Sequence, residues 1–140
     1  MASAPDDPIA VMDELVRRQR AGERCVLATV VAVSGSTPRE PGARMLVLDD
    51  RTLGTIGGGL REAEVVERAR GMLGTAGVEL ADLDFEEGLG GGEGPICGGR
   101  MRVLIESFAP PTRIVICGAG HVGLALHRIL AVMGLSAVVI

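Results

Sequence analysis

Ile114-Val-Ile-Cys-Gly-Ala-Gly-His-Val-Gly123 is the stretch that decides the fold class, because it joins an apolar run to a glycine turn and then to a helical pattern. A dinucleotide-type phosphate turn requires this order of strand, turn and helix. Gly118 would make the turn, Gly120 would let the backbone approach a ligand, and Gly123 would let the helix pack on the strand. His121 would stand near the helix start, where phosphate contact, packing and capping are all open roles. The stretch predicts the opening of a β-α-β unit.

Two more glycine clusters lie upstream, at 57–59 and in the run Gly88-Leu-Gly-Gly-Gly-Glu-Gly-Pro-Ile-Cys-Gly-Gly99. The chain has 21 glycines in 140 residues, which is about twice the average usage. Glycine is costly to order, so such clusters indicate that backbone approaches something closely. Gly57, Gly58 and Gly59 precede a helical pattern, and free N–H groups there would suit an anion. A tight strand-to-helix turn is the alternative.

The remaining pattern predicts three helices and seven strands. A helix begins at Pro8, capped by Asp6 or Asp7, and ends at Gly22. A second helix covers 60–73, with an inner stripe of Leu60, Ala63, Val66, Ala69 and Leu73. Strands are expected at 25–33, 43–48, 52–56, 78–85, 101–108, 113–117 and 137–140, with a third helix at 121–133, and the first strand is apolar enough to be buried on both faces.

These elements predict an α/β protein with two parts. An N-terminal α+β domain covers residues 8–108, Ala109-Pro-Pro-Thr112 forms a linker, and residues 113–140 open a truncated Rossmann-like β-α-β unit. The acidic ribose-binding residue would be expected about 20 residues after the glycine turn, where this sequence stops. Because so short a unit leaves apolar strands and sheet edges uncovered, we expect self-association into a homo-oligomer.

Composition excludes several classes of protein. The net charge is -4, there is no Trp or Tyr, and only two Phe are present, which disfavours nucleic acid as a partner. No apolar stretch is long enough to cross a membrane and no signal peptide is visible. Three widely spaced cysteines fit neither a disulfide framework nor a zinc site. The sequence therefore predicts a cytoplasmic protein that holds no metal of its own.

Four polar side chains are candidate ligand contacts, three in the loop between two predicted strands and one at the beginning of the second strand. Ser36 and Thr37 offer hydroxyl groups, while Arg39 and Arg44 offer forked donors suited to a phosphate or a pterin carbonyl. Two prolines fix φ angles in this loop, so its shape is restricted before any ligand arrives. A polar surface loop with Arg44 in a salt bridge is the alternative interpretation.

The cysteines divide into one candidate site residue and two candidate core residues. Cys97 ends the long glycine run beside Gly98 and Gly99, where backbone amides could lower the pKa of the thiol and make it a soft ligand. A small buried hydrophobic role is the alternative. Cys25 and Cys117 fall inside apolar strands, and we interpret both as core. Glu62 and Glu64, early in the second helix, are interpreted as partners of the helix dipole.

Four segments in this order resemble the XdhC/CoxI family of xanthine dehydrogenase accessory factors. They are Val33-Ser-Gly-Ser-Thr-Pro-Arg-Glu-Pro-Gly-Ala-Arg-Met45, Gly54-Thr-Ile-Gly-Gly-Gly-Leu-Arg-Glu62, Ile96-Cys-Gly-Gly-Arg-Met-Arg-Val103 and Ile116-Cys-Gly-Ala-Gly-His-Val-Gly123. The resemblance implies an accessory protein that binds molybdenum cofactor (molybdopterin) and assists its loading, in sulfurated form, into a molybdenum hydroxylase such as xanthine dehydrogenase. The partners it implies are a sulfurtransferase and a subunit of the hydroxylase.

The expected cofactor site joins the three glycine clusters and the polar loop. Its residues are Ser36, Thr37, Arg39, Arg44, Gly57, Gly58, Gly59, Cys97, Gly98, Gly99, Gly118, Gly120, His121 and Gly123. No catalytic triad or pair of acid–base carboxylates is visible, so we assign no enzymatic reaction and expect a maturation factor. The alternatives are an NAD(P)-dependent oxidoreductase fragment, although NAD(P) is not expected with the acidic residue missing, and a docking module that binds no ligand.

Overall fold

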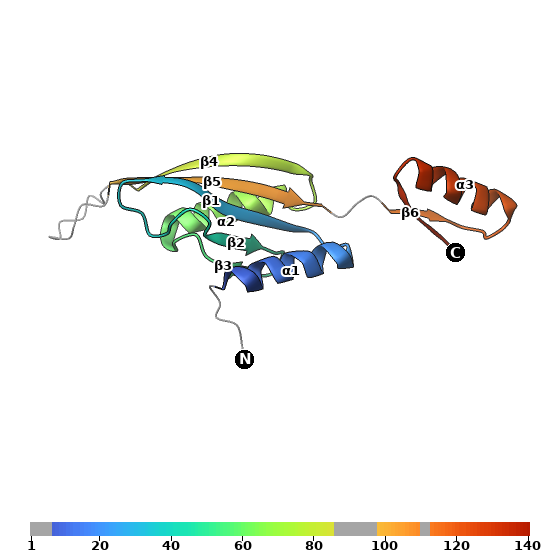
Figure 1. The fold of residues 1–140 in the computed structure, drawn as a ribbon, viewed down its shortest axis with the longest axis horizontal. Helices are drawn as coiled ribbons and strands as arrows, with labels where there is room; N and C mark the ends of the chain where they lie inside the picture. Colours follow the sequence, from blue (N-terminus) through green and yellow to red (C-terminus); the bar gives the residue numbers. More distant parts are fainter. Residues whose placement is uncertain (1–6, 86–97, 110–112) are drawn as a thin grey trace. The chain divides into compact units, whose positions relative to one another are not determined.

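The computed structural model describes residues 7–85, 98–109 and 113–140, and the chain divides into two compact units, Met1–Ala109 and Pro110–Ile140. Along the first unit run α1 (Pro8–Ala21), β1 (Cys25–Ser34), β2 (Arg44–Val47), β3 (Thr52–Gly54), α2 (Gly59–Met72), β4 (Gly77–Phe85) and β5 (Gly99–Phe108) (Figure 1). The strands form one antiparallel sheet in the order β3-β2-β1-β5-β4. The order of helices and strands is the one that the sequence predicts, and the protein is of the α/β class.

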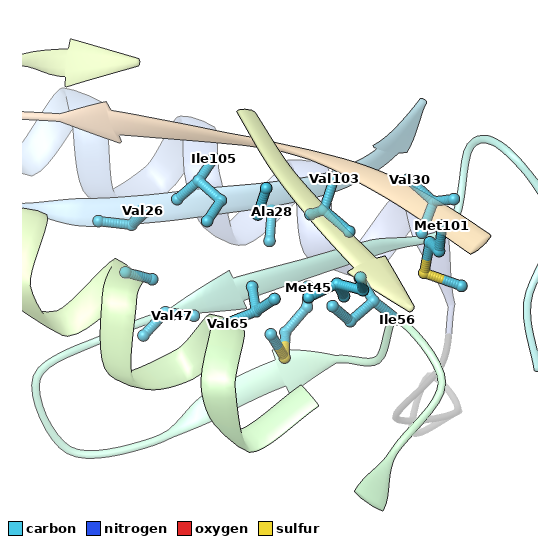
Figure 2. Close-up of a cluster of buried hydrophobic side chains, with 13 residues drawn as sticks. Val26, Ala28, Val30, Met45, Val47, Ile56, Val65, Met101, Val103 and Ile105 are labelled. Atoms are coloured by element: carbon cyan, nitrogen blue, oxygen red, sulfur yellow. The ribbon is translucent and has the colours of Figure 1, made fainter. Parts of the chain in front are cut away.

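Alternate residues of the central strand β1 supply two separate cores. Val26, Ala28 and Val30 pack with α2 in the larger cluster, part of which is drawn in Figure 2. Cys25 and Leu27 pack with α1 in the smaller cluster. Because neighbouring residues of a strand point to opposite faces, the two helices cover opposite faces of the sheet.

Burial on both faces ends partway along β1. Thr29 is half-buried, and Val31 and Ala32 are exposed, whereas the sequence predicted a strand buried throughout. The register against β5 shifts between Val30 and Ala32. A bulge of this kind bends a strand and increases its twist, and here it coincides with the point where burial on both faces ends.

The predicted inner stripe of α2 is confirmed in its later part and wrong in its first turn. Val65 and Ala69 are its buried residues, whereas Leu60 is 82% exposed and Ala63 is also exposed. Val66 and Leu73, which belong to the predicted stripe, pack against the core with Ala69, so the prediction is wrong only for Leu60 and Ala63. The ends of α1 match their prediction, because Asp7 accepts a hydrogen bond from the Ile9 amide and Gly22 ends the helix with φ of 70°.

The second unit contains β6 (Arg113–Ile116), α3 (His121–Val132) and β7 (Ser136–Val139), with β6 and β7 paired in parallel. Ile116 and Leu130 are its buried hydrophobic residues, while Val122 and Val132 are more than 80% exposed. Cys117 is exposed, so its interpretation as core is wrong. The strand ends at Ile116, and the sheet face that lies away from Ile116 has little to cover it in a unit of two strands. Self-association remains a prediction.

An acidic residue on α1 should make stability depend on pH. A hydrogen bond from Arg17 lowers the pKa of Glu14, burial opposes this, and Arg18 adds to it, so that the pKa falls from about 4.5 to about 2. Ionised Glu14 therefore contributes to stability above pH 4.5, and the contribution is lost as the pH falls toward 2. We expect Glu14→Gln to destabilise the protein by about 1 kcal/mol at pH 7, after allowance for solvent screening.

Far-UV circular dichroism during urea unfolding at pH 7, 4 and 2.5 measures this effect. The difference between wild type and Glu14→Gln should shrink along that series. Asp13→Asn, one position away on the exposed side of α1, provides the control. A difference that stays constant down to pH 2.5 would contradict the assignment.

Candidate functional site

Glycine contacts bring the polar loop that follows β1 onto the beginning of β5. Gly35 has φ of 70°, and a Cβ there would overlap the Gly98 carbonyl oxygen and lie 3.1 Å from the Gly99 Cα. A Cβ at Gly99 would overlap the Ser36 carbonyl oxygen and lie 2.9 Å from the Thr37 Cγ2. Two segments more than 60 positions apart in the sequence are thus held in backbone contact, which explains why glycine is needed at these positions.

The same loop meets the triple glycine on its other side. Gly57 has φ of 142°, and a Cβ there would lie 2.5 Å from Pro38 Cγ. Gly58 and Gly59 also have positive φ, of 78° and 69°. Three consecutive residues in conformations that favour glycine let the chain turn sharply from β3 into α2 while it packs on the proline.

A surface cleft of about 470 Å³ lies where these segments meet. It is lined by Ser36, Thr37, Pro38, Gly57, Gly58, Gly59, Leu60, Arg61 and Phe85. The volume lies within the range of about 300–1,000 Å³ that is typical of small-molecule sites. A neighbouring hollow of about 250 Å³ is lined by Gly98 and Gly99 with Asp84, Phe85 and Arg100. Phe85 lines both, so the two hollows adjoin at the end of β4.

Glu62 accepts hydrogen bonds from the backbone segment that leads into one wall of the cleft. One of its oxygens, Oε2, accepts hydrogen bonds from the Thr55 hydroxyl, from the Ile56 amide at 3.0 Å and from the Gly58 amide at 2.9 Å. Thr55 Oγ1 in turn accepts the Gly57 amide at 3.1 Å. The Gly57 and Gly58 amides therefore donate within the turn and to Glu62, and they are not the free N–H groups that were predicted to suit an anion.

Electrostatics keep this carboxylate ionised. Burial raises the pKa of Glu62, but the hydrogen bonds from Thr55, Gly58 and Ile56 outweigh burial, so the net shift is downward. Glu64 lies on the exposed side of the helix, where its hydrogen bonds with Arg68 and Arg61 lower its pKa. The two acids that the sequence analysis treated alike thus have different surroundings, and Glu62 is the one that shapes the cleft.

The two arginines of the polar loop do not line the cleft. Arg44 lies in β2, paired with Thr29 of β1. Arg39 follows the cleft-lining segment, and the Thr37 hydroxyl donates to the Arg39 carbonyl oxygen at 3.1 Å. Among the residues that the structure describes, the cation on the cleft wall is Arg61, whose guanidinium also pairs with Glu64 at 3.2 Å.

Four residues that line the cleft were not among the predicted site residues: Pro38, Leu60, Arg61 and Phe85. Arg61 had a signal, because a forked donor in the first turn of a helix that follows three glycines is well placed for an anion. Phe85 had no such signal, because the sequence around it shows only the end of an alternating strand. Cys97 lies outside the described residues, so its predicted role remains a prediction.

The glycine turn of the second unit forms its own local structure. Gly118 has φ of 115°, and a Cβ at Gly123 would overlap the Gly118 carbonyl oxygen and lie 3.5 Å from Ile116 Cγ2. The first turn of α3 therefore packs directly on the end of β6. His121 begins α3 and is exposed, and Gly120 has open space around its Cα.

Comparisons with known proteins agree with this architecture. The model of the XdhC and CoxI family matches residues 18–84, which run from α1 to β4 and include most of the cleft lining. The uncharacterized protein YqeB of Escherichia coli (strain K12) is 33% identical over 108 residues, which are 77% of this chain and 20% of that protein. A probable xanthine dehydrogenase subunit of Bacillus subtilis (strain 168) is 35% identical over 106 residues, 74% of this chain and 31% of that protein.

The fold is also found in a solved structure. A crystal structure of a xanthine dehydrogenase from Bacillus halodurans superimposes with a TM-score of 0.55 at 19% identity, covering 96% of this chain and 62% of that one. The chain thus spans less than a third of the two curated relatives and under two thirds of the structural one. The match of the family model identifies residues 18–84 of this chain, from α1 to β4, as a segment of the XdhC and CoxI family.

Proposed function

We propose that this protein takes part in the maturation of a molybdenum hydroxylase such as xanthine dehydrogenase, by carrying molybdenum cofactor as cargo. The observation that carries the proposal is the convergence of two family segments, Ser36–Pro38 and Gly57–Arg61, on one cleft, with a third beginning at Gly98 beside it. The family match of residues 18–84 gives the class of partner. The relative from Bacillus subtilis, named as a probable subunit of xanthine dehydrogenase, supports the choice of hydroxylase.

The cleft has the chemistry that such a cargo needs. Pro38, Leu60 and Phe85 provide apolar surface for the flat pterin rings, and Arg61 provides a forked donor for the phosphate. No Trp or Tyr is present in the chain, so stacking is limited to one Phe ring at the cleft. Modest stacking suits a carrier that must release its cargo to a partner enzyme.

Transfer of a sulfurated cofactor also calls for a soft ligand near the metal. Cys97 directly precedes Gly98, which lines the hollow that adjoins the cleft. A thiolate at that position would coordinate molybdenum or hold sulfur in transit. A sulfurtransferase as donor of that sulfur, and a location in the cytoplasm with the partner enzyme, are parts of the same proposal.

In the portions of the chain that the structure describes, every helix is too short or too polar to cross a membrane.

Cys97→Ser tests the proposal directly, because serine keeps the size of the side chain and removes the soft ligand. We expect the variant to retain no more than about one tenth of the molybdenum that the wild type retains, because it loses a metal–thiolate bond. Molybdenum cofactor released anaerobically from a purified hydroxylase is the probe, and bound metal is measured by elemental analysis after gel filtration.

Cys117→Ser is the matched control, since Cys117 is exposed and lies in the other unit. Equal retention by the Cys97 variant and the wild type would remove the thiol from the site and leave the cleft as the candidate. A wild-type protein that retains no cofactor would overturn the carrier function and favour a docking module.

A further inference from the structure

One carboxylate fixes a whole turn of backbone at the cleft. Oε2 of Glu62 accepts from the hydroxyl of Thr55 and from the amides of Ile56 and Gly58, and Thr55 Oγ1 accepts from the amide of Gly57. Each of the four residues from 55 to 58 thus donates into one network. Glu62 is half-buried, and its side chain reaches from α2 back to the turn that follows β3.

Ordinary helix capping explains only part of this network. A glutamate early in a helix often accepts the amide of the residue that precedes the helix, as Glu62 does with Gly58. The bonds to Ile56 and Thr55 reach two and three residues further back, beyond any helical position. They hold the segment that forms the cleft wall rather than the end of the helix.

The wall needs such a restraint because of its composition. Gly57, Gly58 and Gly59 adopt positive φ values that only glycine accepts easily. The same glycines make the unrestrained segment flexible, since glycine loses more conformational freedom on ordering than any other residue. No side chain at these positions can supply rigidity, so it must come from a neighbouring residue. Hydrogen bonds to an ionised carboxylate are about twice as strong as neutral ones, which suits Glu62 to this task.

We propose that Glu62 is the positioning residue of the cleft: its carboxylate holds the turn at 55–58 in the shape that receives the ligand. The part of this inference that concerns ligand affinity rests on the proposed function. The part that concerns the shape of the turn rests on the hydrogen bonds alone. Glu62 itself does not line the cleft among the described residues, so it acts through Gly57 and Gly58.

Three variants of α2 separate positioning from simple helix capping. Glu62→Ala removes the acceptor, Glu62→Gln keeps one oxygen acceptor of the same length, and Glu67→Gln removes an exposed carboxylate from the same helix as a control. Hydrogen exchange at single amides is measured by NMR in the full chain. In Glu62→Ala we expect the amides of Ile56 and Gly58 to exchange at least about tenfold faster, while those of Val65 and Ala69 keep their protection.

Cofactor binding supplies the second measurement. Glu62→Ala should bind molybdenum cofactor about tenfold more weakly than the wild type at a temperature where α2 stays protected, and Glu62→Gln should recover part of the affinity. Unchanged exchange at Ile56 and Gly58 in Glu62→Ala would overturn the positioning role. So would a uniform loss of protection along α2, which is the signature of a helix cap. Should the wild type bind no cofactor, the proposed function fails, and the exchange pattern still decides whether Glu62 holds the turn.

Discussion

Replacing Gly99 with alanine is expected to lower the free energy of unfolding by about 3 kcal/mol, at the upper end of the cost of overpacking. A Cβ there would overlap the Ser36 carbonyl oxygen and lie 2.9 Å from Thr37 Cγ2. The first of these contacts is with backbone, so no change of rotamer relieves it. Gly99 also pairs with Phe85 at the start of β5, so moving it away disturbs the sheet end that borders both hollows.

The adjacent glycine provides a matched control. A Cβ at Gly98 meets nothing within 4 Å, and its φ is not positive, so Gly98→Ala should change stability by no more than about 0.5 kcal/mol. Because the chain has no Trp or Tyr, far-UV circular dichroism during urea unfolding is the suitable probe. Equal unfolding midpoints for the two variants would show that Ser36 and Gly99 are not in contact in solution.

The order of helices and strands could be predicted because each depends on local signals. Asp7, Pro8 and Gly22 mark the ends of α1, and the alternation in β4 and β5 gives strands that lie half-buried in the sheet. Periodicity predicted that Val66, Ala69 and Leu73 pack on the core, but it did not single out Val65. The apolar residues of α2 form more than one possible stripe, and only the packing of Val65 and Ala69 on the sheet selects among them.

The site could be predicted only as a set of segments. Glycine clusters indicated where the backbone is approached closely. Gly99 and Gly123 meet backbone carbonyl oxygens, and Gly57 meets the ring of Pro38. Which side chains line the cleft depends on long-range geometry. Thr29 pairs with Arg44 and carries it into the sheet, whereas the start of α2 turns Arg61 toward the cleft. The network of Glu62 was missed because its partners precede the helix and only a folded turn brings them together.

The contact between Gly57 and Pro38 gives the second large effect. Gly57→Ala should lower the free energy of unfolding by about 2–4 kcal/mol, because it combines a positive φ of 142° with a Cβ placed 2.5 Å from Pro38 Cγ. Gly42→Ala is the control for strain alone. Gly42 lies in the loop that contains Pro38 and has φ of 95°, yet a Cβ there meets nothing within 4 Å.

A double-mutant cycle with Pro38→Ala isolates the clash from the strain. Pro38→Ala removes the Cγ that the new methyl group would strike, so the double variant should lose less stability than the sum of the single variants. We expect a coupling of about 1–2 kcal/mol, which is typical of residues in direct contact. Additive losses would mean that the polar loop moves away from the triple glycine. In that case the cleft would not exist as a preformed site, and a ligand would have to assemble it. Strong coupling means that the two loops hold the cleft open together before any cargo arrives, which lowers the entropic cost of binding.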